Sequence, residues 1–248
     1  MSYAIAVDCS CDMAMDRIDL IDSHVHLWPA SAANPEGHRW MKEGELLTKQ
    51  HILDDYYQAI HKNNGDESTP FVRGIIYIET DRRLLSPNGG ALSVWAHQAV
   101  EEIKFLRQIV EGQGTAERTY TAGDAEKLVG IVLWAPVNMG PAVFEEWLKL
   151  AKDTAGETTW DVVKGFRFLL QGITDQLEFE KLVLSDDFIA TMRLFRAKGR
   201  NFSFDVGVDQ HSGGVWQLEA MVKVIERVHE GVPEDEKVTF ILSALSSF

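Results

Sequence analysis

A chain of 248 residues with 45% hydrophobic and 25% charged residues has the length and composition of one ordinary globular domain. Its formal net charge of −14 at pH 7 argues against nucleic acid or an anionic membrane surface as a partner, because both would repel it. No run of eighteen apolar residues occurs, so no membrane span is expected.

Residues 1–17 are predicted to form an N-terminal arm ahead of one domain over residues 18–248. The arm carries acids and lacks the basic start of a signal peptide, so a cytoplasmic location is expected. Its Cys9 and Cys11 are the only cysteines, and a pair spaced this closely is predicted to be free thiols in a reducing compartment.

Apolar stretches rich in β-branched residues predict six strands, with a segment of helical periodicity after each of the first five. In chain order, the expected strands cover residues 17–25, 71–79, 128–135, 162–170, 201–208 and 237–242. The expected helices lie within residues 50–63 and 91–112, after Pro141 in a first turn, after Ser185 as an N-cap, and over residues 215–229.

Alternation of strand and helix without hairpin signals predicts parallel strands joined by right-handed crossovers. The chain therefore contains five βα units and a sixth strand. Both a doubly wound sheet and a (β/α)8 barrel fit this pattern. The first turn, "DSHVHLWP", contains no glycine, which disfavours nucleotide binding.

Polar side chains gather where the expected strands end. They are Asp22, His24 and His26; Glu79, Thr80 and Asp81; Asn138; Arg167 and Gln171; Asp205 and Asp209. His24 and His26 project from the same side of an extended strand, the geometry in which two nitrogens can bind one ion. The alternative is a pair of hydrogen-bonded histidines at a strand end.

Three further strand-end residues are candidates, and the first two have two interpretations each. Glu79 is either a general base or a solvated loop acid. Arg167 is either a clamp for a substrate oxygen or the partner of Glu79 or Asp205 in a salt bridge. Asp205 lies in an otherwise apolar strand, and a buried acid needs a partner.

Tryptophans and the remaining histidines are assigned by their context. Trp28 and Trp40 fall in the first long loop and are candidates to wall a substrate pocket. The other tryptophans at helical spacing are expected in the core: Trp95, Trp147 and Trp216. The remaining histidines are expected to be solvated: His38, His51, His61, His97, His211 and His229.

Five blocks in order carry a resemblance to a known family: "IDSHVHLWP", "GIIYIETDRR", "LVGIVLWAPVNMGP", "VKGFRFLLQG" and "FSFDVGVDQHSGGVWQLEA". Together they resemble the amidohydrolase-related proteins of the metal-dependent hydrolase superfamily, and most closely the fungal L-rhamnono-gamma-lactonase-like group. The likeness extends over about residues 18–242. It implies a (β/α)8 TIM-barrel fold and hydrolysis of a small cyclic ester, with a sugar lactone as the expected substrate.

The resemblance also implies roles for individual residues. His24 and His26 match metal-ligand or carbonyl-polarising positions, and the implied ion is divalent, with zinc as first choice and a metal-free site as the alternative. Arg167 matches a substrate-contacting arginine and Glu79 a site acid, both catalytic candidates. Trp28 and Asp205 are added as candidate substrate-binding residues. The oligomeric state is left open.

The sequence departs from the family after its sixth strand. Ser243 and Ala244 stand where the family has an acid or amide followed by histidine, and a seventh and an eighth strand are not encoded. We therefore expect an incomplete barrel of five βα units and a sixth strand, with little or no activity. It is either a hydrolase whose sequence has been cut short or a non-catalytic remnant or binding protein; an intact smaller α/β binding protein fits less well.

Overall fold

The computed structural model describes residues 19–62, 71–114, 118–209 and 213–242. The expected arm over residues 1–17, with Cys9 and Cys11, lies outside these residues. So do His211, Ser243 and Ala244.

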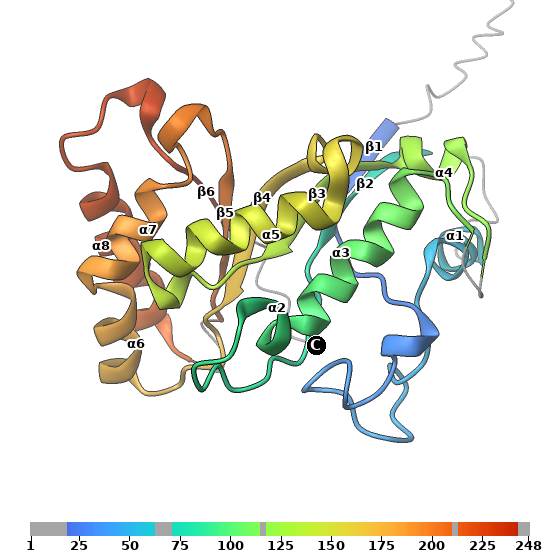
Figure 1. Ribbon diagram of the computed structural model, residues 1–248, viewed down its shortest axis with the longest axis horizontal. Coiled ribbons are helices and arrows are strands. Elements are labelled where there is room, and N and C mark those ends of the chain that lie inside the picture. Colours follow the sequence, from blue (N-terminus) through green and yellow to red (C-terminus); the bar gives the residue numbers. More distant parts are fainter. Residues whose placement is uncertain (1–18, 63–70, 115–117, 210–212, 243–248) are drawn as a thin grey trace, which may run out of the picture.

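Six parallel strands form one sheet whose spatial order is the chain order, β1 to β6 (Figure 1). The strands are β1 (Asp19–Val25), β2 (Phe71–Ile78), β3 (Leu128–Trp134), β4 (Val163–Leu169), β5 (Ser203–Gly207) and β6 (Thr239–Leu242). Each new strand is added on the same side, whereas a doubly wound sheet reverses its order. The expected incomplete TIM-barrel fold is confirmed as a curled half-barrel.

Helices follow the first five strands, and α3 and α5 lie in front of the strands in Figure 1. They are α1 (Leu53–Lys62), α2 (Leu92–Trp95), α3 (His97–Val110), α4 (Ala122–Lys127), α5 (Pro141–Trp160), α6 (Gln176–Val183), α7 (Asp186–Arg193) and α8 (Val215–His229). Short 3-10 turns occupy Ala30–Ala32, Val137–Met139, Ala197–Gly199 and Glu234–Glu236.

Local sequence accounts for several helix boundaries. Pro141 opens α5, and the Ser185 side chain accepts a hydrogen bond from the Phe188 amide at the start of α7, both as predicted. The expected helix over residues 91–112 is divided at Ala96 into α2 and α3. The short helices α4 and α6 were not predicted; Thr121 caps α4 in a capping box.

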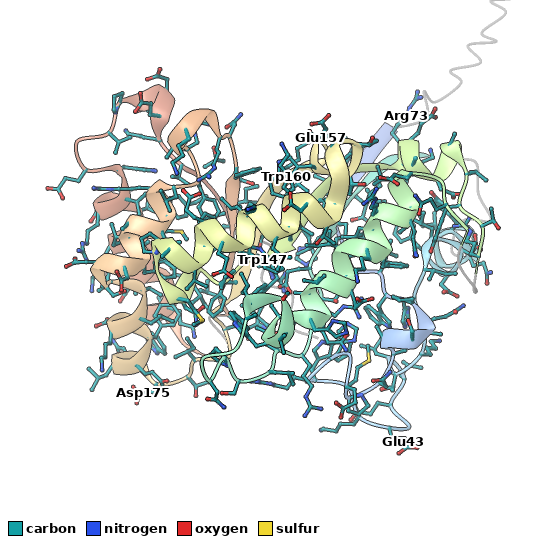
Figure 2. The ribbon with its side chains drawn as sticks, viewed as in Figure 1. Glu43, Arg73, Trp147, Glu157, Trp160 and Asp175 are labelled. Carbon is teal, nitrogen blue, oxygen red and sulfur yellow. The ribbon has the colours of Figure 1, made fainter. Side chains whose placement is uncertain are left out.

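The core lies between the sheet and its helices. Trp147 on α5 (Figure 2) is fully buried and packs edge-on against Trp134 with ring centroids 4.9 Å apart. Trp95 is also buried, as expected, whereas Trp216 is only partly buried. This packing fixes the strands whose ends carry the polar side chains.

The two outer strands, β1 and β6, each pair with a single neighbour within the described residues. Apolar side chains are exposed on these strands: Ile21 on β1, and Ile241 and Leu242 on β6. No helix in the part of the chain that the structure describes is long and apolar enough to cross a membrane.

Candidate active site

The two histidines of the first strand meet at its carboxyl end. His24 Nε2 and His26 Nε2 lie 3.1 Å apart. His26 Nδ1 is 2.9 Å from the Ile78 carbonyl, which can only accept, so Nδ1 carries the proton and Nε2 keeps its lone pair. β2 thus holds the ring of His26 in the tautomer whose Nε2 lone pair can bind a metal ion or accept a hydrogen bond.

The environment favours the neutral form of both imidazoles. Burial is the largest cause that lowers the pKa of His26 to about 4, and the positive charge of Arg167 acts in the same direction. His24 is exposed on one side, but lost solvent and Arg167 lower its pKa as well. Neutral imidazole is the form that binds metal ions and polarises carbonyl groups.

Asp22 fixes the backbone of this strand end rather than facing the histidine rings. Its Oδ1 accepts a hydrogen bond from the His24 amide at 3.2 Å, and its Oδ2 accepts one from the Tyr56 hydroxyl of α1 at 2.9 Å. Asp22 therefore links the backbone of His24 at the end of β1 to Tyr56 on α1.

Arg167 on β4 reaches across β3 to the end of β2. Its Nε lies 2.9 Å from Glu79 Oε1, an ion pair in which the N–H does not point at the oxygen. Burial raises the pKa of Glu79 to about 7, although Arg167 opposes this rise. The salt-bridge interpretation of Arg167 is the one that the structure shows, with Glu79 as partner.

Asp205 on β5 is the register partner of Arg167 on β4 and lies beside it, and Asp205 is 2% exposed. Its charge also acts on His24, whose pKa it raises against the larger effect of burial. The structure thus brings five predicted site residues together at the strand ends: His24, His26, Glu79, Arg167 and Asp205.

Two expectations need correction. Glu79 was predicted to be either a general base or a solvated loop acid, and the second alternative is wrong, because its side chain is fully buried and its Oε2 accepts a hydrogen bond from the Asp81 amide at 2.6 Å. Trp28 was expected to wall a pocket, but it is 5% exposed within a small cluster of the first loop (residues 26–52), where its Nε1 donates to the Lys49 carbonyl.

The histidine assignments also change. His38 was expected in solvent, yet it is fully buried, with Nδ1 2.8 Å from the Ala32 carbonyl and Nε2 2.9 Å from Thr80 Oγ1. His51 and His229 are partly buried, whereas His97 is exposed as expected. The side chain of His61 lies outside the described residues.

A buried acid that the sequence analysis missed lies under the second strand. Glu102 on α3 is 1% exposed, and its Oε1 accepts hydrogen bonds from the Tyr77 hydroxyl at 2.7 Å and from the Thr80 amide and hydroxyl at 3.0 and 2.7 Å. Its place on the apolar face of α3, with Ala99 and Leu106, was an available signal. The network holds the end of β2 in place.

The fit of a metal ion can be judged from the histidines. Two nitrogens that share a tetrahedral zinc ion at 2.0–2.1 Å lie about 3.3–3.4 Å apart, close to the 3.1 Å between His24 Nε2 and His26 Nε2. Within the described residues no group of three or more histidine, cysteine or acidic side chains is arranged for a metal. The pair therefore fits as two ligands of an ion.

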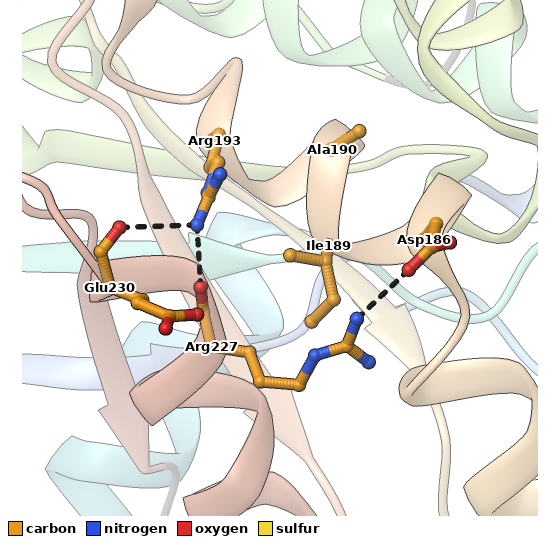
Figure 3. Close-up of a pocket in the computed structure, with 6 residues that line it drawn as sticks. All are labelled: Asp186, Ile189, Ala190, Arg193, Arg227 and Glu230. Carbon is orange, nitrogen blue, oxygen red and sulfur yellow. Dashed lines mark hydrogen bonds and ion pairs between the residues drawn. The ribbon is translucent and has the colours of Figure 1, made fainter.

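A hollow of about 420 Å³ lies elsewhere, between α7 and α8 (Figure 3). Its two arginines are already engaged: Arg227 pairs with Asp186 at 2.9 Å, and Arg193 donates to the carbonyls of Arg227 and Glu230. None of the strand-end residues lines it, so it is not part of the candidate site.

No protein-family model matches the chain. L-Rhamnono-gamma-lactonase from Scheffersomyces stipitis is 29% identical over 217 residues, which cover 86% of this chain and 58% of that protein. The resemblance to the amidohydrolase-related family is confirmed. This chain thus spans little more than half the length of that curated protein.

Solved structures of two other proteins also align with the chain. A crystal structure of an amidohydrolase from Burkholderia multivorans aligns with a TM-score of 0.51 and 16% identity, over 84% of this chain and 53% of that one. Amidohydrolase 2 from Bifidobacterium longum subsp. infantis aligns with a TM-score of 0.49 and 19% identity, over 91% and 60% of the two chains. The Burkholderia structure supports the half-barrel fold described above.

Proposed function

We propose that the strand-end site of this chain serves the hydrolysis of a sugar lactone, a cyclic ester such as L-rhamnono-1,4-lactone. The observation that supports this most directly is the pair of imidazoles whose Nε2 atoms lie 3.1 Å apart, with the Arg167 guanidinium close enough to lower the pKa of both. The similarity to a lactonase along 86% of the chain favours a cyclic ester over other hydrolase substrates.

In the proposed reaction, a water oxygen bonds to the lactone carbonyl carbon. The ring carbon–oxygen bond then breaks, and the ring oxygen takes up a proton to give the open hydroxy acid. His24 and His26 would hold a divalent ion such as zinc, which when bound supplies Lewis-acid polarisation of a carbonyl. In a metal-free site, His24 Nε2 would instead donate a hydrogen bond to the carbonyl oxygen.

Arg167 is assigned the contact with the substrate, because a guanidinium stabilises negative charge that develops on a carbonyl oxygen. Glu79, fully buried against Arg167, is assigned a positioning role. Asp205 beside Arg167 stays a substrate-binding candidate. A cytoplasmic location and the absence of nucleic-acid partners stay predictions.

The proposal is tested by binding of L-rhamnono-1,4-lactone to the chain, measured by calorimetric titration. We expect saturable binding that weakens about tenfold or more in Arg167→Ala, because a charge-assisted contact is lost. Arg196→Ala is the matched control: Arg196 is bonded to the Asp235 carbonyl away from the strand ends. No binding by the unchanged protein, or equal loss in both variants, contradicts the proposal.

Turnover is a separate question. With only two metal ligands arranged among the described residues, we expect little or no lactone hydrolysis by this chain. The alternative function, a non-catalytic binding protein derived from the same fold, shares the binding result and differs only in rate. Hydrolysis above that of a His24→Ala, His26→Ala double variant would contradict the expectation of low turnover.

A further inference from the structure

Asp81 has a left-handed backbone directly after the second strand. Its φ is 52°, and it is one of three non-glycine residues with positive φ in the part of the chain described. This conformation is unfavourable for a side chain with a Cβ and persists only where the surroundings enforce it. Such strain gathers at functional sites.

Buried groups on both sides enforce the turn. The Asp81 amide donates to Glu79 Oε2 at 2.6 Å, while Glu79 itself is fully buried against Arg167. The preceding residue, Thr80, is held by Glu102 through its amide and its hydroxyl. The position of Asp81 is therefore fixed by two buried carboxylates.

The first loop places an arginine next to this turn. His38 Nε2 lies 2.9 Å from Thr80 Oγ1, and Trp40 Nε1 donates to the Thr80 carbonyl at 2.9 Å. Arg39 lies between these two anchors and is exposed. These two contacts with Thr80, the residue before Asp81, thus bring Arg39 beside Asp81.

The charged side chains of Asp81 and Arg39 have no hydrogen-bond or ion-pair partner among the described residues. The Asp81 carboxylate is partly buried, yet it makes no hydrogen bond or ion pair with any residue that the structure describes, and Arg39 makes none either. Burial raises the pKa of Asp81, and the positive charges of Arg167 and Arg39 oppose that rise. A fixed carboxylate stands within the influence of two guanidinium groups.

We infer that Asp81 and Arg39 form a hydroxyl-binding corner that selects a polyhydroxylated lactone ring over a bare one. The two oxygens of a carboxylate can accept hydrogen bonds from adjacent hydroxyl groups, and a guanidinium can donate to a third oxygen. A site built to bind hydroxyl groups rejects analogues that lack them, because its polar groups are then left without partners. This inference rests on the proposed function.

The test compares two lactones with the same five-membered ring. L-Rhamnono-1,4-lactone carries hydroxyl groups, and γ-butyrolactone carries none; each is titrated into the full chain. We expect Asp81→Asn to weaken binding of the rhamnono-lactone about tenfold or more and to leave weak γ-butyrolactone binding unchanged. Arg39→Ala is expected to act in the same direction with a smaller effect.

Two glycine variants separate binding from folding. Asp81→Gly removes both the carboxylate and the strain, and Lys198→Gly removes comparable strain at a residue with φ of 58° on the exposed Ala197–Gly199 turn. Both are expected to keep or raise the melting temperature, because glycine adopts positive φ freely. Only Asp81→Gly should lose rhamnono-lactone binding.

The outcomes distinguish this inference from the function on which it rests. If the unchanged protein binds rhamnono-lactone and Asp81→Asn binds it equally well, the hydroxyl-binding corner is wrong and the proposed function stands. If the unchanged protein binds neither lactone, both are overturned. Loss of both lactones in Asp81→Asn would also overturn the corner, since it would show a role unrelated to hydroxyl groups.

Discussion

At the scale of the residue, the site depends on a few buried charges whose partners lie far away in the sequence. One carboxylate oxygen of Glu79 forms an ion pair with the Arg167 guanidinium, and the other accepts a hydrogen bond from the Asp81 amide. Removing one member of such a buried set costs more than an exposed contact would, because the remaining groups stay desolvated without a partner. Glu79 thus holds Arg167 and the backbone of Asp81 in place.

Glu79 should give stability a particular dependence on pH. Its folded pKa of about 7 is above the value of 4.5 expected when unfolded, so the folded state holds this proton longer. Its contribution is fully present below pH 4.5 and is lost as pH rises from there to about 7.

Urea unfolding of the wild type and Glu79→Gln at pH 5 and pH 8 measures this effect. The wild type should lose on the order of 1–3 kcal/mol relative to the variant over that interval. A constant difference between the two proteins at both pH values would show that Glu79 keeps an ordinary pKa.

At the scale of the element, the first loop is fastened to the end of β2 and is more ordered than its sequence suggests. His38 and Arg82 form an antiparallel bridge, and the Arg83 amide donates to the Gly37 carbonyl at 2.9 Å. Trp40 adds the contact to Thr80. The first loop is therefore a fixed part of the structure at the carboxyl ends of the strands.

Trp40→Phe should loosen the first loop while an aromatic ring still fills the position of the indole. The phenyl ring keeps most of the apolar contact but lacks the Nε1–H that Thr80 accepts, and a lost hydrogen bond costs about 1 kcal/mol. Limited trypsin digestion should then cut faster after Lys42 and Lys49. Trp216→Phe on α8 is the control, and equal acceleration in both variants would argue against the anchor.

The elements themselves were largely predictable. Near-continuous apolar runs mark parallel strands buried on both faces, and all six strands lie within two residues of their predicted ends. The misses were α4 and α6, six and eight residues long, and the division at Ala96. Short helices carry too few residues for their periodicity to stand out.

The site was predictable only in part. His24, His26 and Arg167 follow from their positions at strand ends. The burial of His38 and the partners of Glu102 do not, because these contacts join segments some 20–40 residues apart in the chain. A single sequence shows which side chains can pair, but the packing that buries them is a tertiary property.

At the scale of the whole molecule, the described sheet has two open edges. β6 exposes Ile241 at 44% and Leu242 at 58%, and its outer backbone groups have no strand beside them in the described residues. Open, apolar strand edges promote pairing with another chain. The net charge of −14 opposes such association at low salt.

We therefore expect self-association that increases with salt and depends on β6. Ile241→Lys should weaken it about tenfold, because a charge on an edge strand discourages pairing. Sedimentation velocity at two salt concentrations measures the effect. Leu177→Lys on α6, where the side chain is 78% exposed, is the matched control, and an equal effect of both substitutions would remove β6 from the interface.

The measurement that tests the central claim most directly is nuclear magnetic resonance of histidine ring nitrogens during titration with L-rhamnono-1,4-lactone. If the strand-end site binds the lactone, the Nε2 resonances of His24 and His26 will shift together and saturate, while exposed His97 on α3 stays unchanged. Shifts that do not saturate, or that are equal at His97, would contradict the assignment of this site to lactone binding.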